Sequence, residues 1–218
     1  MALPKLTAQE IILKFELQVS DVTELSASEE LYLLNRIYQK VCADRAWEFL
    51  KKNQTGSLSG SGSGGYYITV PDDFAFFYEN NNYTENNSIT YNNTCPRVIF
   101  IGTNYTPYQI VNYGDRMQYR NNTGYCYLDI GAGKIYFTGT PTEITYSMDY
   151  IKTPALLTLT DYPIFNGRFH DILVFGMATS SDIINLSPKA TSYKQENENM
   201  YNQYLLDMQY HYSQLIQI

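Results

Sequence analysis

The chain has 218 residues and a formal net charge of −7, because 22 acidic residues outnumber 15 lysines and arginines. A protein that binds nucleic acid by neutralising phosphates needs clustered cations, so the net negative charge argues against a nucleic-acid clamp. No stretch approaches the ~18 consecutive apolar residues of a membrane span, and the first ten residues lack the basic and apolar regions of a signal peptide. We therefore expect a cytoplasmic chain without membrane contact.

Two capping boxes predict two helices at the amino end. In the first, Thr7 and Glu10 can each bind the amide of the other, and apolar residues at helical spacing extend the helix over 8–18. In the second, Ser26 and Glu29 open a longer helix that closes near Lys52. We expect these two helices to pack as an antiparallel pair.

A run of glycine and serine follows at 56–65, and its small side chains indicate a flexible connector. Beyond it the apolar period changes to two, in short runs rich in β-branched and aromatic residues and bounded by Asn, Gly and Pro. These runs predict antiparallel strands at 66–70, 74–78, 98–101, 108–111, 125–130, 135–137 and 144–150. We expect a small β-sandwich or barrel with a long exposed Asn-rich loop at 80–93.

The helical period returns after Pro154. Pro163 can occupy the first turn of a third helix that runs to about residue 184, and Ser187 with Pro188 is typical of the start of a last helix. Each pair of helices alone would leave an apolar face uncovered, which favours packing of the two pairs together.

The order of these elements predicts an α+β fold. The helix pairs at the two ends of the chain, residues 1–65 and 155–218, are expected to form one helical body. Residues 66–154 are expected to form an inserted antiparallel β domain.

Residues suited to catalysis are few. His170 and His211 lie on predicted helices, where hydrogen bonding at the edge of the core and packing are the expected roles. Asp72 and Asp73 follow a proline and would point to opposite faces of a strand, so they favour a turn over a glycosidase pair.

Metal chemistry is not indicated either, because no spacing of His, Cys and Glu is typical of a metal site. Three separated cysteines are expected to remain reduced and structural: Cys42, Cys95 and Cys126. We predict that the chain is not an enzyme and has no catalytic residue, cofactor or metal.

The last predicted helix is rich in tyrosine, a residue that is enriched where proteins meet. Its tyrosines are spread over more than one face, so one seam within the chain cannot bury them all. We infer a partner for this helix. The residues that we predict to bind it are Tyr204, Met208, Tyr212 and Ile216.

The order of several motifs resembles the head-to-tail adaptor (connector) proteins of tailed phages. The motifs are LLNRI at 33–37, AWEFL at 46–50, YYITVPDDF at 66–74, YSMDYIKTP at 146–154 and RFHD at 168–171. The last two are similar to the return from the β domain into the third helix of that family. The bias toward Asn, Tyr and Ile also fits an AT-rich genome, such as that of a crAss-like phage.

The resemblance implies a structural protein of the virion, located at the portal and tail vertex and assembled in the host cytoplasm. It implies a homo-oligomeric ring of about twelve copies that binds beneath the portal protein, extends the DNA channel and docks the downstream tail or ring proteins. DNA would pass through the lumen without specific binding, which suits an acidic chain.

Two other interpretations stay open. The chain could be a tail tube or gatekeeper component, which would lie farther from the portal. Its β domain could instead be a carbohydrate-binding module of a tail protein, and a cluster of aromatic residues on one sheet face would favour that function. The candidate sugar-stacking residues are Tyr66, Tyr67, Tyr78, Tyr83 and Tyr91.

Overall fold

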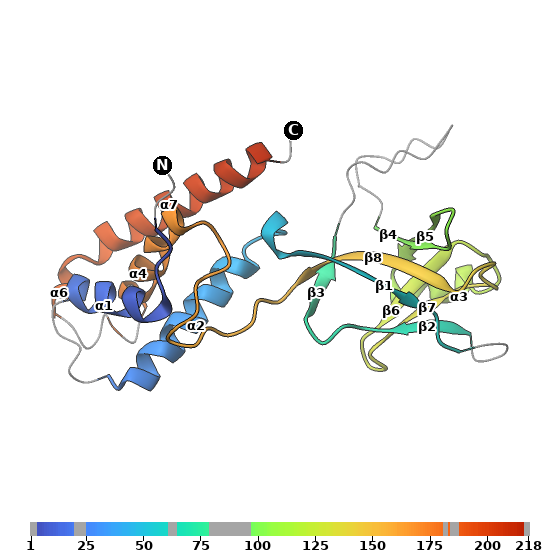
Figure 1. The fold of residues 1–218 in the computed structure, drawn as a ribbon, viewed down its shortest axis with the longest axis horizontal. Coiled ribbons are helices and arrows are strands. Elements are labelled where there is room, and N and C mark those ends of the chain that lie inside the picture. Colours follow the sequence, from blue (N-terminus) through green and yellow to red (C-terminus); the bar gives the residue numbers. More distant parts are fainter. Residues whose placement is uncertain are drawn as a thin grey trace. The chain divides into compact units, whose positions relative to one another are not determined.

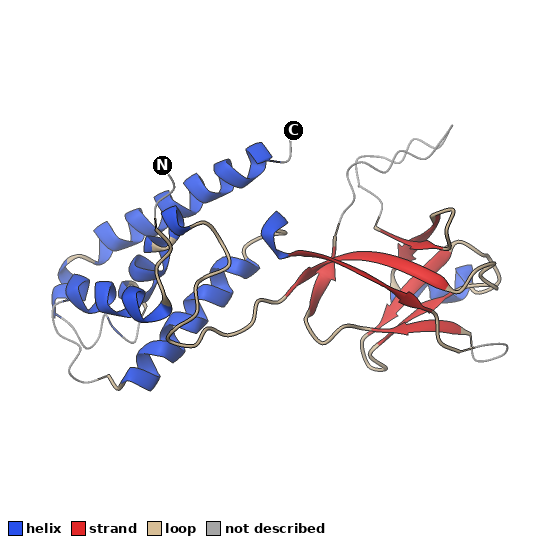
Figure 2. Ribbon diagram, viewed as in Figure 1, coloured by secondary structure: helices blue, strands red, loops and turns tan. Residues whose placement is uncertain are grey.

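The computed structural model describes residues 4–19, 25–60, 65–78, 97–180, 183 and 188–215. The chain divides into two units (Figure 1): a helical unit, made of Met1–Leu50 and Thr153–Ile218, and a β unit, made of Lys51–Lys152. Nearly all helices belong to the first unit and all strands to the second (Figure 2). The predicted α+β fold with an inserted β domain is confirmed.

The helical unit is organised around one short apolar helix. Its helices are α1 (Ala8–Val19), α2 (Ala27–Ala43), α4 (Asp171–Ala178), α6 (Pro188–Ser192) and α7 (Lys194–Leu215), with single 3-10 turns η1 (Glu48–Leu50) and η4 (Gly167–Phe169). Helix α4 is apolar on nearly every side, as expected of a central helix, and it packs against α1, α2 and α7.

Both predicted capping boxes are present. The Thr7 amide donates to the Glu10 carboxylate at 2.7 Å, and the Ser26 amide donates to the Glu29 carboxylate at 2.8 Å. These reciprocal bonds satisfy amides that a helix start would otherwise leave without a partner. They explain why the starts of α1 and α2 were predictable to within a residue.

The third helix is shorter than predicted and does not begin at Pro163. Asn166 accepts the Arg168 amide at 3.1 Å and so opens η4 instead, and α4 follows from Asp171. A side chain at Gly167 would meet the backbone of Pro4 at 2.8 Å. The amino-terminal segment thus lies directly against the turn that precedes α4.

The β unit is a single sheet that closes almost completely into a barrel. Its strands are β1 (Lys51–Ser57), β2 (Tyr66–Thr69), β3 (Phe74–Phe77), β4 (Val98–Ile101), β5 (Thr106–Val111), β6 (Tyr125–Asp129), β7 (Lys134–Phe137) and β8 (Thr145–Lys152). They pair in the order β1-β8-β4-β5-β6-β7-β2, and β3 also pairs with β8. A bridge between Ser59 and Tyr67 joins the end of β1 to β2.

The first strand replaces the end of the predicted second helix and the start of the predicted connector. Helix α2 ends at Ala43 instead of near Lys52. Residues 51–57 pair with β8 along their whole length, and Leu58 is buried in the barrel core. A side chain at Gly56 would meet the Tyr146 ring at 3.0 Å, so glycine is what allows this strand to lie against the tyrosine. The β unit therefore begins at Lys51 rather than at residue 66. Positions 61–64 of the predicted connector lie outside the described residues.

One strand pair is parallel, contrary to the all-antiparallel prediction. Strands β5 and β6 pair in parallel, and the chain between them forms η3 (Tyr113–Asp115) and α3 (Arg116–Tyr119). Parallel neighbours need such a crossover, because a tight turn can join only antiparallel strands. The predicted loop at 80–93 lies outside the described part of the chain.

Candidate interaction surfaces

Histidine 170 has the structural role predicted for it. The ring is fully buried; the Leu6 amide donates to Nδ1 at 3.0 Å, and Nε2 lies 3.2 Å from the Phe165 carbonyl oxygen. Because Nδ1 accepts this hydrogen bond, the neutral ring carries its hydrogen on Nε2. Nε2 therefore donates a hydrogen bond to the Phe165 carbonyl oxygen. Burial lowers the pKa of His170, so the ring is held neutral. His211 packs against Phe169 on the same side of the unit.

Two glutamates meet where α1 and α2 face one another. Glu30 is only 5% exposed, and its carboxyl group is hydrogen-bonded to that of Glu16. Burial and the neighbouring Glu16 raise the pKa of Glu30 to about 7. Glu30 therefore loses its proton near neutral pH rather than near pH 4.5.

The acidic pair after Pro71 belongs to a turn, as predicted. The Phe74 amide donates to the Pro71 carbonyl at 3.0 Å. Asp73 accepts the Tyr150 hydroxyl at 2.6 Å and lies 2.8 Å from the Lys52 ammonium. These contacts hold the Asp73 carboxylate within the β unit.

Among the residues that the structure describes, no three His, Cys, Asp or Glu side chains gather as a metal site would require. The described helices include none that is both long and apolar enough to cross a membrane. Cys42 and Cys126 are buried free thiols, as predicted, whereas Cys95 lies outside the described residues.

The predicted partner-binding residues of α7 mostly face the chain's own core. Met208 is fully buried, and Tyr204 stacks on Phe175 of α4 with ring centroids 5.8 Å apart. The Tyr212 hydroxyl accepts the Asn166 amide at 3.0 Å, and its ring lies among other aromatic rings. Ile216 lies outside the described residues. The three described residues thus anchor α7, and their contact with a partner stays a prediction.

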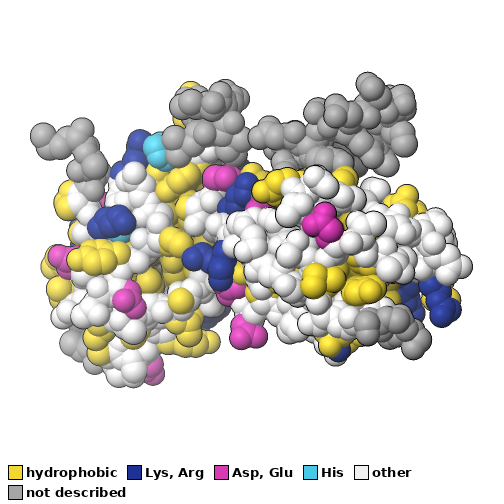
Figure 3. Space-filling model, turned by 45° about the vertical axis from the view of Figure 1, so that its right-hand side comes forward, with side chains coloured by type: hydrophobic (Ala, Val, Ile, Leu, Met, Phe, Trp, Pro, Cys, Tyr) yellow, Lys and Arg dark blue, Asp and Glu magenta, His cyan; other side chains and the backbone are white. Residues whose placement is uncertain are grey.

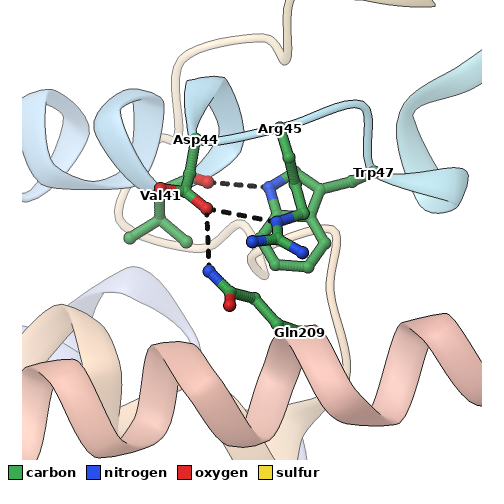
Figure 4. A network of polar contacts seen from close by, with 5 residues as sticks. All are labelled: Val41, Asp44, Arg45, Trp47 and Gln209. Carbon is green, nitrogen blue, oxygen red and sulfur yellow. Dashed lines mark hydrogen bonds and ion pairs between the residues drawn. The ribbon is translucent and has the colours of Figure 1, made fainter.

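A polar network also ties α7 to the end of α2 (Figure 4). Gln209 donates to the Asp44 carboxylate at 3.1 Å, and the same oxygen receives the Arg45 Nε at 3.3 Å. The Trp47 indole donates to the Val41 carbonyl at 2.8 Å. The Gln209 bond thus adds a polar contact between α7 and the end of α2.

The outward sides of α7 and α1 carry exposed apolar residues. On α7, Leu206 and Tyr210 are four positions apart, on one face, and are 58% and 69% exposed. On α1, Leu13 and Leu17 have the same spacing, and Leu17 is 78% exposed. On the face shown in Figure 3, charged side chains cover a minor part of the surface. Both helices pack against α4.

A row of tyrosines crosses the outer face of the β unit. We call Tyr67, Tyr136, Tyr127 and Tyr113 the tyrosine row. Tyr136 of β7 lies directly opposite Tyr67 of β2 and Tyr127 of β6 in the strand register. Successive ring centroids are 5.9, 5.6 and 5.9 Å apart. Side chains alternate along a strand, and Ile135 beside Tyr136 is buried in the barrel, so the row faces outward.

The sequence prediction found only one member of this row. Tyr67 was among the candidate sugar-stacking residues, whereas Tyr66 packs against the barrel core and Tyr78 lies beneath the Lys51 ammonium at 4.0 Å. Tyr83 and Tyr91 lie outside the described residues. The available signal was alternation: Tyr127 follows the buried Cys126, and Tyr136 follows the buried Ile135.

The net charge is uneven between the two units. The helical unit has 8 lysines and arginines against 14 acidic residues, and the β unit has 7 against 8. The acidic character of the chain is therefore a property of the helical unit.

Comparison of the chain with protein-family models and with curated proteins found no match.

Proposed function

We propose that this chain is the subunit of a head-to-tail adaptor of a tailed bacteriophage. It is a structural protein rather than an enzyme, and about twelve copies form a ring beneath the portal at the tail vertex of the virion. The ring extends the DNA channel and offers the tail a docking surface.

The observation that carries this proposal is the pair of exposed apolar faces on the helical unit. The interfaces within a ring of identical subunits are heterologous, so each copy needs two different surfaces that fit one another. A further surface can bind a neighbouring ring. Leu206 and Tyr210 supply one such face on α7, and Leu13 with Leu17 supplies another on α1. Exposed apolar pairs of this kind are typical of protein contacts.

The charge distribution agrees with a DNA channel. Each phosphate that a channel wall neutralises adds affinity that would resist movement of the DNA. A helical unit with six more acidic than basic residues provides a wall with little such affinity. In the assembled ring, acidic residues should outnumber basic ones on the lumen wall, and a lumen lined mainly by Lys and Arg contradicts the proposal.

The test mixes the purified chain with purified portal rings and measures the mass and symmetry of the product by electron microscopy. We expect a second ring attached to one end of the portal. A chain that stays monomeric and leaves the portal bare contradicts the proposal. A ring that forms without the portal and binds only distal tail proteins supports a gatekeeper instead.

Charged substitutions locate the contacts. Leu206→Glu with Tyr210→Glu should abolish attachment, and Leu13→Glu with Leu17→Glu should do the same through the other face. Ile144→Glu is a matched control, because Ile144 is an exposed apolar residue of the β unit. Attachment that survives both double substitutions places the contacts elsewhere on the subunit.

A further inference from the structure

The tyrosine row has features that packing of the barrel does not require. The interior of the barrel is filled by residues on the other side of the same strands, such as Ile135 and Phe137. The row lies outside that core and continues from β2 across β7 and β6 to Tyr113 beyond β5. The four rings follow one another along this face, with Tyr127 and Tyr136 stacked and the two outer pairs tilted or edge-on.

A cation lies over the tyrosine ring at each end of the row. The Lys134 ammonium lies 3.9 Å from the centroid of the Tyr67 ring, and the Arg116 guanidinium lies 3.9 Å from that of Tyr113. Neither cation forms an ion pair with any described residue. Asp129 lies opposite Lys134 in the register, but its carboxylate accepts the Ala132 amide instead. Each end of the row therefore offers a positive charge without a carboxylate partner.

The hydroxyl groups of the row are also free of protein partners in the described part of the chain. Tyrosines elsewhere in the β unit behave differently: Tyr150 donates to Asp73 at 2.6 Å, and the Tyr146 hydroxyl accepts the Gln54 amide at 3.0 Å. The row thus combines aromatic rings with unengaged donors and acceptors, and positive charge stands only at its ends.

We propose that the tyrosine row binds an acidic saccharide. Sugar rings are uncharged, offer C–H groups that pack on aromatic rings, and carry hydroxyls that bond to tyrosine hydroxyls. A carboxylate at each end of the bound segment would meet Lys134 or Arg116, in charge-assisted hydrogen bonds. This inference does not depend on the adaptor function.

Sparse negative charge distinguishes this ligand from nucleic acid. Single strands also stack on aromatic residues, but every nucleotide adds a phosphate, and such sites line the whole strand with cations. The four tyrosines of the row have a cation only at each end. A uronic acid saccharide with uncharged sugars between its carboxylates matches that spacing of charge.

The test measures binding of short hyaluronan oligomers to the full chain by isothermal titration calorimetry, because uncharged N-acetylglucosamine separates their glucuronic acid carboxylates. Oligomers of N-acetylglucosamine are the matched neutral probe, and oligothymidylate is the nucleic-acid probe. We expect binding of the hyaluronan oligomers that weakens with added salt, with weaker binding of the neutral oligomers. Equal binding of the neutral oligomers, tighter binding of oligothymidylate, or no saccharide binding overturns the proposal.

Two conservative variants locate the site without disturbing the fold. Lys134→Gln should weaken binding of the acidic oligomer about tenfold and leave binding of the neutral oligomer unchanged. Tyr136→Phe keeps the ring and removes one hydroxyl, so it should weaken both saccharides. Tyr210→Phe on α7 is the control and should change neither. Binding that is indifferent to both row variants overturns the assignment, and thermal melting verifies that each variant is folded.

Discussion

Asn35 and Leu157 exchange two hydrogen bonds inside the helical unit. The Leu157 amide donates to the Asn35 side-chain oxygen at 2.7 Å, and the Asn35 side-chain nitrogen donates to the Leu157 carbonyl at 3.0 Å. Both residues are buried, so water cannot replace either bond. One polar side chain of α2 thereby holds the backbone by which the chain returns from the β unit.

Asn35→Ala should therefore destabilise the helical unit. The substitution leaves a buried amide and a buried carbonyl of Leu157 without partners, which costs about 1–3 kcal/mol. Gln39→Ala, at an exposed position of the same helix, is the control and should change the free energy of unfolding by less than about 0.5 kcal/mol. Urea unfolding measures both. Equal stability of the two variants would mean that the return segment is held by other contacts.

Met208 and Leu206 form a matched pair on α7. Met208→Asp places a carboxylate in the apolar core and should cost about 3 kcal/mol or more, through the lost packing and the buried charge. Leu206→Asp makes a similar change at an exposed position and should leave the unfolding free energy within about 0.5 kcal/mol. Circular dichroism during urea titration measures the difference. If Leu206→Asp alone destabilised the chain, the inward and outward faces of α7 would be misassigned.

Glu30→Gln should stabilise the chain at pH 8 and have little effect at pH 4. The pKa of Glu30 is about 7 in the folded chain and near 4.5 when unfolded. Because the folded state holds its proton more tightly, the stabilisation is complete below pH 4.5 and is lost as the pH rises to about 7.

The substituted side chain cannot ionise, so the free energy of unfolding at pH 8 should rise by about 1–3 kcal/mol. Glu196→Gln, at an exposed position of α7, is the control. Urea unfolding at both pH values measures the gain, and a Glu30→Gln effect independent of pH contradicts a raised pKa.

The elements that local chemistry determines were predictable. Capping boxes mark the starts of α1 and α2, and the Gly133 turn between β6 and β7 follows from the glycines near Asp129. Alternation of apolar residues found seven of the eight strands. The inserted arrangement followed from the change of period from helix to strand and back.

The features that depend on distant residues were missed. Strand β1 consists of polar and small residues, and only its pairing with β8 and the close approach of Gly56 to Tyr146 make it a strand. The tyrosine row assembles from η3 and three strands, and no single segment determines the register of those strands. The face of α7 that turns inward depends on its packing against α4, which the sequence of α7 alone does not show. Met208 was therefore predicted to bind a partner although it is buried, whereas Leu206 is exposed.

His170 should make the chain lose stability in mild acid. Burial lowers its pKa in the folded chain, while the unfolded chain keeps a pKa near 6.5. The unfolded state therefore binds a proton first, and stability present above about pH 6.5 is lost as the pH falls toward the folded pKa. Protonation at Nδ1 would also remove the acceptor of the Leu6 amide.

NMR titration of the folded chain tests this directly, because the sequence has only two histidines. His211→Gln removes one imidazole signal and so assigns the other to His170. We expect the His170 signal to titrate below pH 6.5, and its Nδ1 to be the unprotonated nitrogen at pH 7.5. A signal that titrates at pH 6.5 or above would show that the ring is charged or solvated, and that the Leu6 bond does not determine its tautomer.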